Sequence, residues 1–315
     1  MNSVLPRRRA GSGAGAFETS VLGLGCASFW ARRSFPESSA RAVLERALEA
    51  GITLLDTGAS YAKGHAEQRL GRLLRQLGAD PDRLEICTKI GTVHDPRGRP
   101  VKDFAPPRIV DQTAASLDRL GLERVRVLHL HGPLPQHLTD DLRRALERVL
   151  EAGLTDRIGV NGHRPALEAV LDDPLFSVLM PFLSVREPGD RDLIRAAGDT
   201  GRAVLAAGPL ARMSFRPPLL DWLSRSSGRW YLARALARSP RSLLGGRSLR
   251  HALRDRESTP AQLALAWVLE QPGVTATVFG TTRPEHVTEL ARAAARPLPD
   301  TVRRRLRALI DGDPA

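Results

Sequence analysis

The sequence has few cysteines and no long apolar run. Cys26 and Cys87 are the only cysteines among 315 residues, which excludes a disulfide framework and an all-cysteine zinc or iron–sulfur site. A reducing, cytoplasmic location is therefore expected. No stretch of about 18 uninterrupted apolar residues occurs, so we expect no transmembrane helix. The basic N-terminus also lacks the apolar segment of a secretory signal.

Lysine and aromatic residues are scarce as well. Of the 47 basic residues only Lys63, Lys89 and Lys102 are lysines, and aromatics make up 4% of the chain. The formal net charge of +12 raises the possibility of nucleic-acid binding. However, the arginines alternate with acids, as in DDLRRALERVLEAG, and do not gather with aromatics into a stripe. We expect no nucleic-acid partner, and a ligand that carries phosphate explains the basic character better.

Short apolar runs alternate with longer amphipathic segments along most of the chain. Near-continuous apolar runs between polar turns are typical of parallel strands that are buried on both faces. The eight runs are VLGLGCA (21–27), ITLLD (52–56), LEICTK (84–89), VRVLHLH (125–131), DRIGV (156–160), FSVLMPF (176–182), RAVLA (202–206) and VTATVFG (274–280).

The segments between these runs have the marks of helices. PPRIVDQTAASLDRLG opens with prolines and closes at Gly121, and TPAQLALAWVLEQPG starts with a threonine cap before Pro260. Eight strands that are each followed by a helix predict an α/β fold, a (β/α)8 TIM barrel, as a single domain over residues 1–315. One long insertion, about residues 213–257, separates the seventh strand from its helix.

Four polar residues stand at the predicted mouth of the barrel. Asp56 ends the second strand, Lys89 the third and His131 the fourth, while Tyr61 follows Asp56 in the same loop. Taken singly, such an aspartate is usually a turn or cap residue, and such a histidine usually belongs to the core. Functional groups of TIM barrels project from the C-terminal ends of strands, so the conjunction predicts an active site.

These motifs resemble the aldo-keto reductase family over nearly the whole chain. The resemblance rests on GITLLDTGASYAKGHAEQRLGRLL, LEICTKIG, VLHLHGP and TPAQLALAWVLEQPGVTATVFGTTRPEH. It implies that Asp56, Tyr61, Lys89 and His131 stand at the family's four catalytic positions. It also implies an NAD(P)-dependent oxidoreductase that reduces an aldehyde or ketone to an alcohol.

The chemistry of these four residues agrees with that implication. A carbonyl accepts hydride poorly unless its oxygen is polarised and receives a proton. A nearby ammonium at Lys89 favours the phenolate of Tyr61 and so eases proton exchange, and Asp56 would hold that ammonium in place. His131 would donate a hydrogen bond to the carbonyl oxygen. The hydride itself comes from the cofactor.

The resemblance also implies a set of residues for cofactor and substrate. At the fifth and sixth strands it places Asn161 on the nicotinamide carboxamide, and puts Leu179 where the family usually has glutamine. Amides at the start of the last helix favour a phosphate. The cofactor residues are Gly25, Cys26, Asp56, Asn161, Leu179, Gly208, Leu210, Arg212, Gly280, Thr281, Thr282, Arg283 and His286. Trp30, Tyr61 and His131 are expected to line the substrate pocket.

Several alternatives stay open at the level of sequence. The family favours NADP, and Arg283 or His286 could meet its 2′-phosphate, but NAD is possible. The same residues would serve a dehydrogenase that oxidises a sugar lactol or alcohol. A non-catalytic regulatory subunit that senses the cofactor is a third reading, although it would not need Tyr61 and His131 together. We expect a small-molecule substrate, no metal and no membrane partner. Substrate identity depends on loops 92–105 and 213–257.

Overall fold

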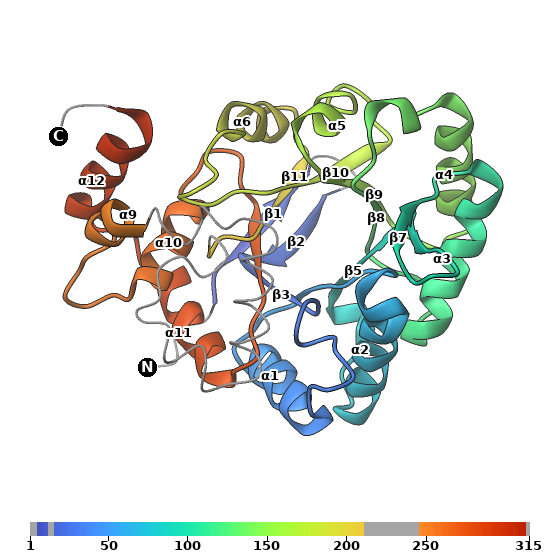
Figure 1. Ribbon diagram of the computed structural model, residues 1–315, viewed down its shortest axis with the longest axis horizontal. Helices are drawn as coiled ribbons and strands as arrows, with labels where there is room; N and C mark the ends of the chain where they lie inside the picture. Colours follow the sequence, from blue (N-terminus) through green and yellow to red (C-terminus); the bar gives the residue numbers. More distant parts are fainter. Residues whose placement is uncertain (1–4, 12–15, 211–245, 313–315) are drawn as a thin grey trace.

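A closed barrel of eight parallel strands forms the centre of the protein. The computed structural model describes residues 5–11, 16–210 and 246–312. It confirms the predicted (β/α)8 fold, and each of the eight apolar runs overlaps one barrel strand (Figure 1). In order around the barrel the strands are β10 (Phe176–Pro181), β11 (Ala203–Ala207), β12 (Ala276–Phe279), β3 (Leu22–Gly25), β4 (Leu54–Asp56), β5 (Glu85–Ile90), β8 (Val127–His131) and β9 (Ile158–Gly162).

Helices surround the barrel on its outside (Figure 1). They are α1 (Glu37–Glu49), α2 (His65–Gln76), α3 (Pro106–Leu120), α4 (Asp140–Glu151), α5 (Arg164–Glu168), α6 (Arg191–Asp199), α9 (Gly246–Ala252), α10 (Pro260–Leu269), α11 (Pro284–Ala294) and α12 (Asp300–Asp311). The predicted ends of two helices are confirmed. Thr259 caps α10 by accepting a hydrogen bond from the amide of Gln262 at 3.3 Å. Helix α3 ends at Gly121, whose φ of 67° is left-handed.

The barrel strands are buried on both faces, and alternate residues pack into two separate cores. Leu54, Cys87 and Val278 belong to the small cluster that fills the barrel, whereas the larger cluster joins the outer faces of the strands to the helices. Gly23 faces the inner cluster, where a Cβ would lie 2.7 Å from the side chain of Leu54. A larger residue at that position would therefore displace the inner packing.

A short antiparallel hairpin, which the sequence pattern did not predict, covers the N-terminal ends of the strands. It consists of β1 (Arg7–Ala10) and β2 (Phe17–Ser20). The guanidinium of Arg8 donates to the backbone oxygens of Leu269, at 2.9 Å, and Val274, at 2.7 Å. Long-range bonds to backbone carbonyls thus hold the hairpin against the bottom of the barrel.

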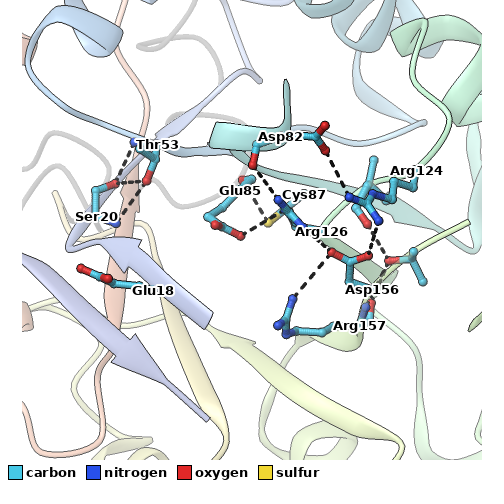
Figure 2. A network of polar contacts seen from close by, with 12 residues as sticks. Glu18, Ser20, Thr53, Asp82, Glu85, Cys87, Arg124, Arg126, Asp156 and Arg157 are labelled. Carbon is cyan, nitrogen blue, oxygen red and sulfur yellow. Dashed lines mark hydrogen bonds and ion pairs between the residues drawn. The ribbon is translucent and has the colours of Figure 1, made fainter. Parts of the chain in front are cut away.

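Charged residues gather at this same end of the barrel (Figure 2). Arg126 donates to Asp156 at 2.8 Å and to the backbone oxygen of Asp82 at 2.6 Å. Glu85 lies at the start of β5 and is 9% exposed; its Oε2 is 3.9 Å from Nε of Arg126 and has no hydrogen-bond partner among the described residues. Burial raises the pKa of Glu85, and the charges of Arg126, Arg157 and Arg7 only partly oppose that rise.

The long insertion after the seventh strand is partly described. It separates β11 from α10 and contains α9, while residues 211–245 lie outside the described ranges. In the described part of the chain, no helix has both the length and the apolar character needed to cross a membrane.

The raised pKa of Glu85 leads to a pH-dependent prediction. Below its ordinary pKa of 4.5, Glu85 is neutral in both the folded and unfolded states. Above 4.5 the unfolded chain loses the proton first, so the wild type loses stability until the raised folded pKa is passed. Glu85→Gln has no proton to lose, so we expect its free energy of unfolding to exceed that of the wild type at high pH. The excess should be about 1.4 kcal/mol for each pH unit by which folding raises the pKa of Glu85.

Urea unfolding of both proteins at a series of pH values measures this difference. The free energy of unfolding of the variant minus that of the wild type should be near zero below pH 4.5. Above pH 4.5 this difference should grow and then level off. If the wild type instead gained stability over the variant above pH 4.5, the surrounding arginines would outweigh the cost of burial.

Candidate active site

Three neighbouring strands bring the four predicted catalytic residues to one side of the barrel mouth. Asp56, Lys89 and His131 lie at the C-terminal ends of β4, β5 and β8, which are consecutive in the barrel. Tyr61 begins the short 3₁₀ helix η2 (Tyr61–Gly64), which follows β4. The side chains therefore meet because their strands are neighbours, as the sequence predicts.

Asp56 and Lys89 form a buried ion pair at the base of this group. The Nζ of Lys89 donates to Oδ1 of Asp56 and, at 2.8 Å, to the backbone oxygen of Thr57. Lys89 is 1% exposed and Asp56 5%. Burial alone would lower the pKa of Lys89, but the charges of Asp56 and Tyr61 outweigh it and the pKa rises. Lys89 is therefore an ammonium group at neutral pH.

The ring of Tyr61 lies next to both Lys89 and His131. The Nζ of Lys89 is 5.2 Å from the centroid of the Tyr61 ring, and the rings of Tyr61 and His131 meet edge to face with centroids 5.4 Å apart. Gly58 makes room for this packing, since a Cβ there would lie 3.2 Å from Tyr61 and 3.4 Å from Lys89. The following residue, Ala62, has a φ of 49°, a strained conformation of the kind that clusters at functional sites.

His131 is a neutral ring in this environment. Burial lowers the pKa of His131 to about 3, with smaller contributions from the charges of Lys89 and Lys102. Its Nδ1 lies 3.3 Å from the hydroxyl of Ser60. Sequence reasoning missed Ser60, although this residue directly precedes Tyr61.

The opposite side of the mouth is lined by glycine. The neighbouring strands β11, β12 and β3 end at or just before Gly208, Gly280 and Gly25. Among the described residues, a Cβ at Gly208 would meet no atom closer than 4.0 Å, and one at Gly280 none closer than 3.6 Å. Gly208 and Gly280 therefore leave the backbone open to close approach by a flat or phosphorylated group, whereas a Cβ at Gly25 would lie 3.3 Å from the backbone oxygen of Phe279.

The first turn of α11 has the features of an anion-binding helix start. Thr281 is 7% exposed, and its hydroxyl accepts from the amide of Arg283 at 3.1 Å and lies 3.0 Å from Nδ1 of His286. The guanidinium of Arg283 is 3.2 Å from Glu285 on the surface. Thr282 is half-buried beside them. The helix dipole at this end favours a phosphate.

Comparison with known proteins decides the family. The family model described as "Aldo/keto reductase family" matches residues 21–311. The chain belongs to the aldo/keto reductase family. It is therefore an oxidoreductase, and the family acts on small carbonyl compounds with NAD(P)H.

Individual relatives agree with this assignment. An uncharacterised oxidoreductase of Mycobacterium tuberculosis is 29% identical over 279 residues, covering 83% of this chain and 80% of its own. A Schizosaccharomyces pombe protein, whose name describes a voltage-gated potassium channel beta subunit, is 24% identical over 301 residues, with 89% and 86% covered.

Solved structures show the same fold. An aldo-keto reductase of Bacillus halodurans in its holo form superposes with a TM-score of 0.79 at 22% identity, covering 99% of this chain and 98% of its own. A glycerol dehydrogenase of Gluconobacter oxydans gives 0.76 at 21% identity, with 99% and 98% covered.

In this aldo/keto reductase the residue expected at the carboxamide is held by the barrel wall. Asn161 is 4% exposed on β9, paired in register with His131. Its Nδ2 donates to the backbone oxygen of Met180 at 2.9 Å, and this bond fixes the side-chain amide.

The structure does not support the expected place of Leu179 at the cofactor. Leu179 packs with the outer cluster between strand and helices, whereas its neighbour Met180 belongs to the inner cluster and pairs with Asn161. Successive residues of a strand face opposite sides, so only one of the two can face the interior. Met180 therefore occupies the inward position.

Two other expected residues are also directed away from the mouth. Cys26 is fully buried in the outer cluster, and burial raises the pKa of its thiol. Trp30 is 1% exposed, and its indole N–H donates to the backbone oxygen of Ala40 on α1 at 3.2 Å. Because a buried indole needs an acceptor and finds one on a helix, Trp30 packs in the core and does not line a pocket.

The remaining predicted cofactor residues follow β11. Gly208 has a φ of 74°, which favours glycine, and its amide donates to the backbone oxygen of Val278 at 3.3 Å. Leu210 is partly buried against the outer cluster. Arg212 lies outside the described residues.

Glu67 has a structural place. It is fully buried and accepts hydrogen bonds from the hydroxyl of Thr88 and, at 2.6 Å, from Nε of Arg119. These bonds tie α2 to β5 and α3. The loop with Tyr61, which leads into α2, is therefore anchored close to its C-terminal end.

A second histidine lies deeper in the barrel. His129 is fully buried beside Lys89, with which it pairs in register, and neither ring nitrogen has a hydrogen-bond partner among the described residues. Gly159 makes room for the ring, since a Cβ there would lie 2.5 Å from its Nδ1. Burial lowers the pKa of His129 well below its usual value, and the charge of Lys89 adds to this effect.

This arrangement leads to a prediction for stability. Removing two buried polar atoms that lack partners should stabilise the fold, so we expect His129→Leu to raise the free energy of unfolding by about 1–2 kcal/mol. His129→Asn, which keeps unpaired polar atoms and leaves a void, should lower it. Denaturant unfolding measures both. A less stable leucine variant would show that the ring has a partner, such as a buried water.

Proposed function

We propose that this aldo/keto reductase reduces an aldehyde or ketone to an alcohol with NADPH, and that Tyr61 supplies the proton. The proposal rests on one observation: the buried Lys89 ammonium contacts Asp56 on one side and the ring of Tyr61 on the other. When bound, the cofactor supplies the hydride. The chain's residues supply the proton, the orientation and the electrostatics.

Tyr61 acts as the general acid of this proposal. The hydroxyl of Tyr61 donates its proton to the carbonyl oxygen as hydride adds to the carbon, and the resulting phenolate is stabilised by the Lys89 ammonium. Asp56 keeps that ammonium charged and fixes its direction. In the reverse direction the phenolate removes the proton from an alcohol, so the same residues serve either direction.

His131 orients the carbonyl. A neutral ring can donate from one nitrogen only. If the hydroxyl of Ser60 donates to Nδ1, the proton is on Nε2, and Nε2 donates to the carbonyl oxygen beside Tyr61. The low pKa of His131 supports this role, because a neutral histidine does not compete with Tyr61 as the proton donor.

The glycine-lined side of the mouth and the start of α11 fit a nicotinamide dinucleotide. Asn161 would hold the carboxamide, the backbone at Gly208 and Gly280 would allow close approach, and Thr281 and Thr282 would meet a phosphate. We propose NADP as the preferred form, because Arg283 and His286 at the start of α11 would offset the two negative charges of a 2′-phosphate.

Replacement of Tyr61 tests the proposal. We expect Tyr61→Phe to bind cofactor as tightly as the wild type but to reduce an aldehyde at least about 100-fold more slowly, because only the proton donor is removed. Nicotinamide absorbance in single turnovers with a panel of aldehydes, run with NADPH and with NADH, measures both steps and the cofactor preference. Equal rates for wild type and variant would remove Tyr61 from the mechanism. Cofactor binding without any turnover by the wild type would instead favour a regulatory role.

A further inference from the structure

All three lysines of this arginine-rich chain lie at the mouth of the barrel. Of the 47 basic residues only Lys63, Lys89 and Lys102 are lysines. Lys89 belongs to the buried ion pair, Lys63 to η2 just after Tyr61, and Lys102 to the end of β7 (Pro100–Lys102). Lys63 and Lys102 have no place in the mechanism above, so their position at the site needs its own explanation.

A hairpin at the mouth contacts both the end of β8, which bears His131, and η2, which bears Tyr61. It is formed by β6 (Thr92–His94) and β7, which lies next to β8 (Figure 1). At its end, the Nζ of Lys102 donates to the backbone oxygen of His131 at 2.6 Å and to the hydroxyl of Thr92 at 2.9 Å. At its turn, Gly98 lies against Lys63, where a Cβ would be 2.5 Å from the ammonium nitrogen. The hairpin therefore holds Lys102 directly beside His131.

Two arginines near these lysines, Arg99 and Arg108, have carboxylate partners, whereas among the described residues Lys63 and Lys102 have none. Asp95 pairs with Arg99 at 2.8 Å, and Asp103 pairs with Arg108 at 3.3 Å. In the described ranges, no carboxylate oxygen lies within 4.0 Å of the ammonium of Lys63 or Lys102. Partial burial lowers the pKa of Lys102, as expected for a cation that lacks a counter-ion.

An ammonium group has three N–H donors, and Lys102 uses two of them on the protein. Among the described residues no third hydrogen bond of the Lys102 ammonium is found, and its charge lies close enough to the His131 ring to lower the pKa of that ring. We infer that Lys102 binds an anionic oxygen group, a carboxylate or a phosphate, on the substrate. The inference rests on the proposed function, and it gives the substrate class as anionic aldehydes or ketones. Lys63 adds positive potential at the other end of the hairpin.

Two matched pairs of aldehydes test the inference. 4-Carboxybenzaldehyde is compared with its methyl ester, and glyceraldehyde 3-phosphate with glyceraldehyde, so that carboxylate and phosphate are tested separately. We expect kcat/KM of the wild type to favour the anionic member of at least one pair by about tenfold or more. The ratio of kcat/KM for the anionic aldehyde to kcat/KM for its neutral partner should fall as salt is added, because ions screen the contact.

Variants separate charge recognition from structural support. Lys102→Met should lower the ratio about tenfold through KM, Lys102→Glu should invert it, and Lys102→Arg should retain most of it. A merely structural role through the His131 carbonyl would lower kcat/KM for both members of a pair and leave the ratio unchanged. Arg108→Met, which removes a nearby charge already paired with Asp103, is the matched control and should not change the ratio.

Two results would overturn the inference, and they can be told apart. If both members of each pair are reduced with equal kcat/KM, Lys102 does not select anions, and the proposed carbonyl reduction stands. If no aldehyde of either pair is reduced with NADPH or NADH, the proposed function fails and the substrate class fails with it.

Discussion

The buried pair of Asp56 and Lys89 is the interaction on which the site depends. An ammonium group at 1% exposure is costly unless a carboxylate and further acceptors compensate for the lost water, and here Asp56 and the backbone oxygen of Thr57 do so. The ring of Tyr61 is a further neighbour of the ammonium. The barrel thus places a fixed positive charge beside a phenol, because Lys89 lies on β5, which pairs with β4, and Tyr61 follows β4.

The order of strands divides the barrel mouth into two halves. On β4, β5 and β8 the strand ends bear Asp56, Lys89 and His131, whereas β11, β12 and β3 end at or just before a glycine. One half offers polar groups that can exchange a proton, and the other offers open backbone next to a helix start. A reaction between a carbonyl and a flat, phosphorylated cofactor needs both halves, which is why the family assignment and the geometry agree.

The sequence was sufficient to predict the barrel and the meeting of Asp56, Tyr61, Lys89 and His131 at its mouth, for a physical reason. A strand buried on both faces is a short apolar run, and a polar residue at its end stands out, as Lys89 does. When both faces of a strand are buried, however, the sequence does not show whether an apolar residue faces the barrel interior or the helices. Leu179 and Met180 are both apolar and both buried, so only the register with β9 shows that Met180 faces inward. Trp30 was misplaced for a similar reason, since its indole partner lies on α1.

The two hairpins were outside the reach of sequence patterns as well. Strands β1, β2, β6 and β7 have three or four residues each and no apolar alternation, and they are held by long-range bonds. Examples are the bonds from Arg8 to Val274 and from Lys102 to His131. Partners so distant in sequence cannot be inferred from either segment alone, and neither can the contact between Ser60 and His131.

The most direct measurement concerns the coupling between Lys89 and Tyr61. The chain has only two tyrosines, Tyr61 and Tyr231, so in a Tyr231→Phe background the ultraviolet absorbance of tyrosinate reports Tyr61 alone. If the ammonium stabilises the phenolate, adding Lys89→Met should move the midpoint of this titration to higher pH by about one unit or more. An unchanged midpoint would contradict the central claim, because Lys89 would then lie beside Tyr61 without acting on its proton.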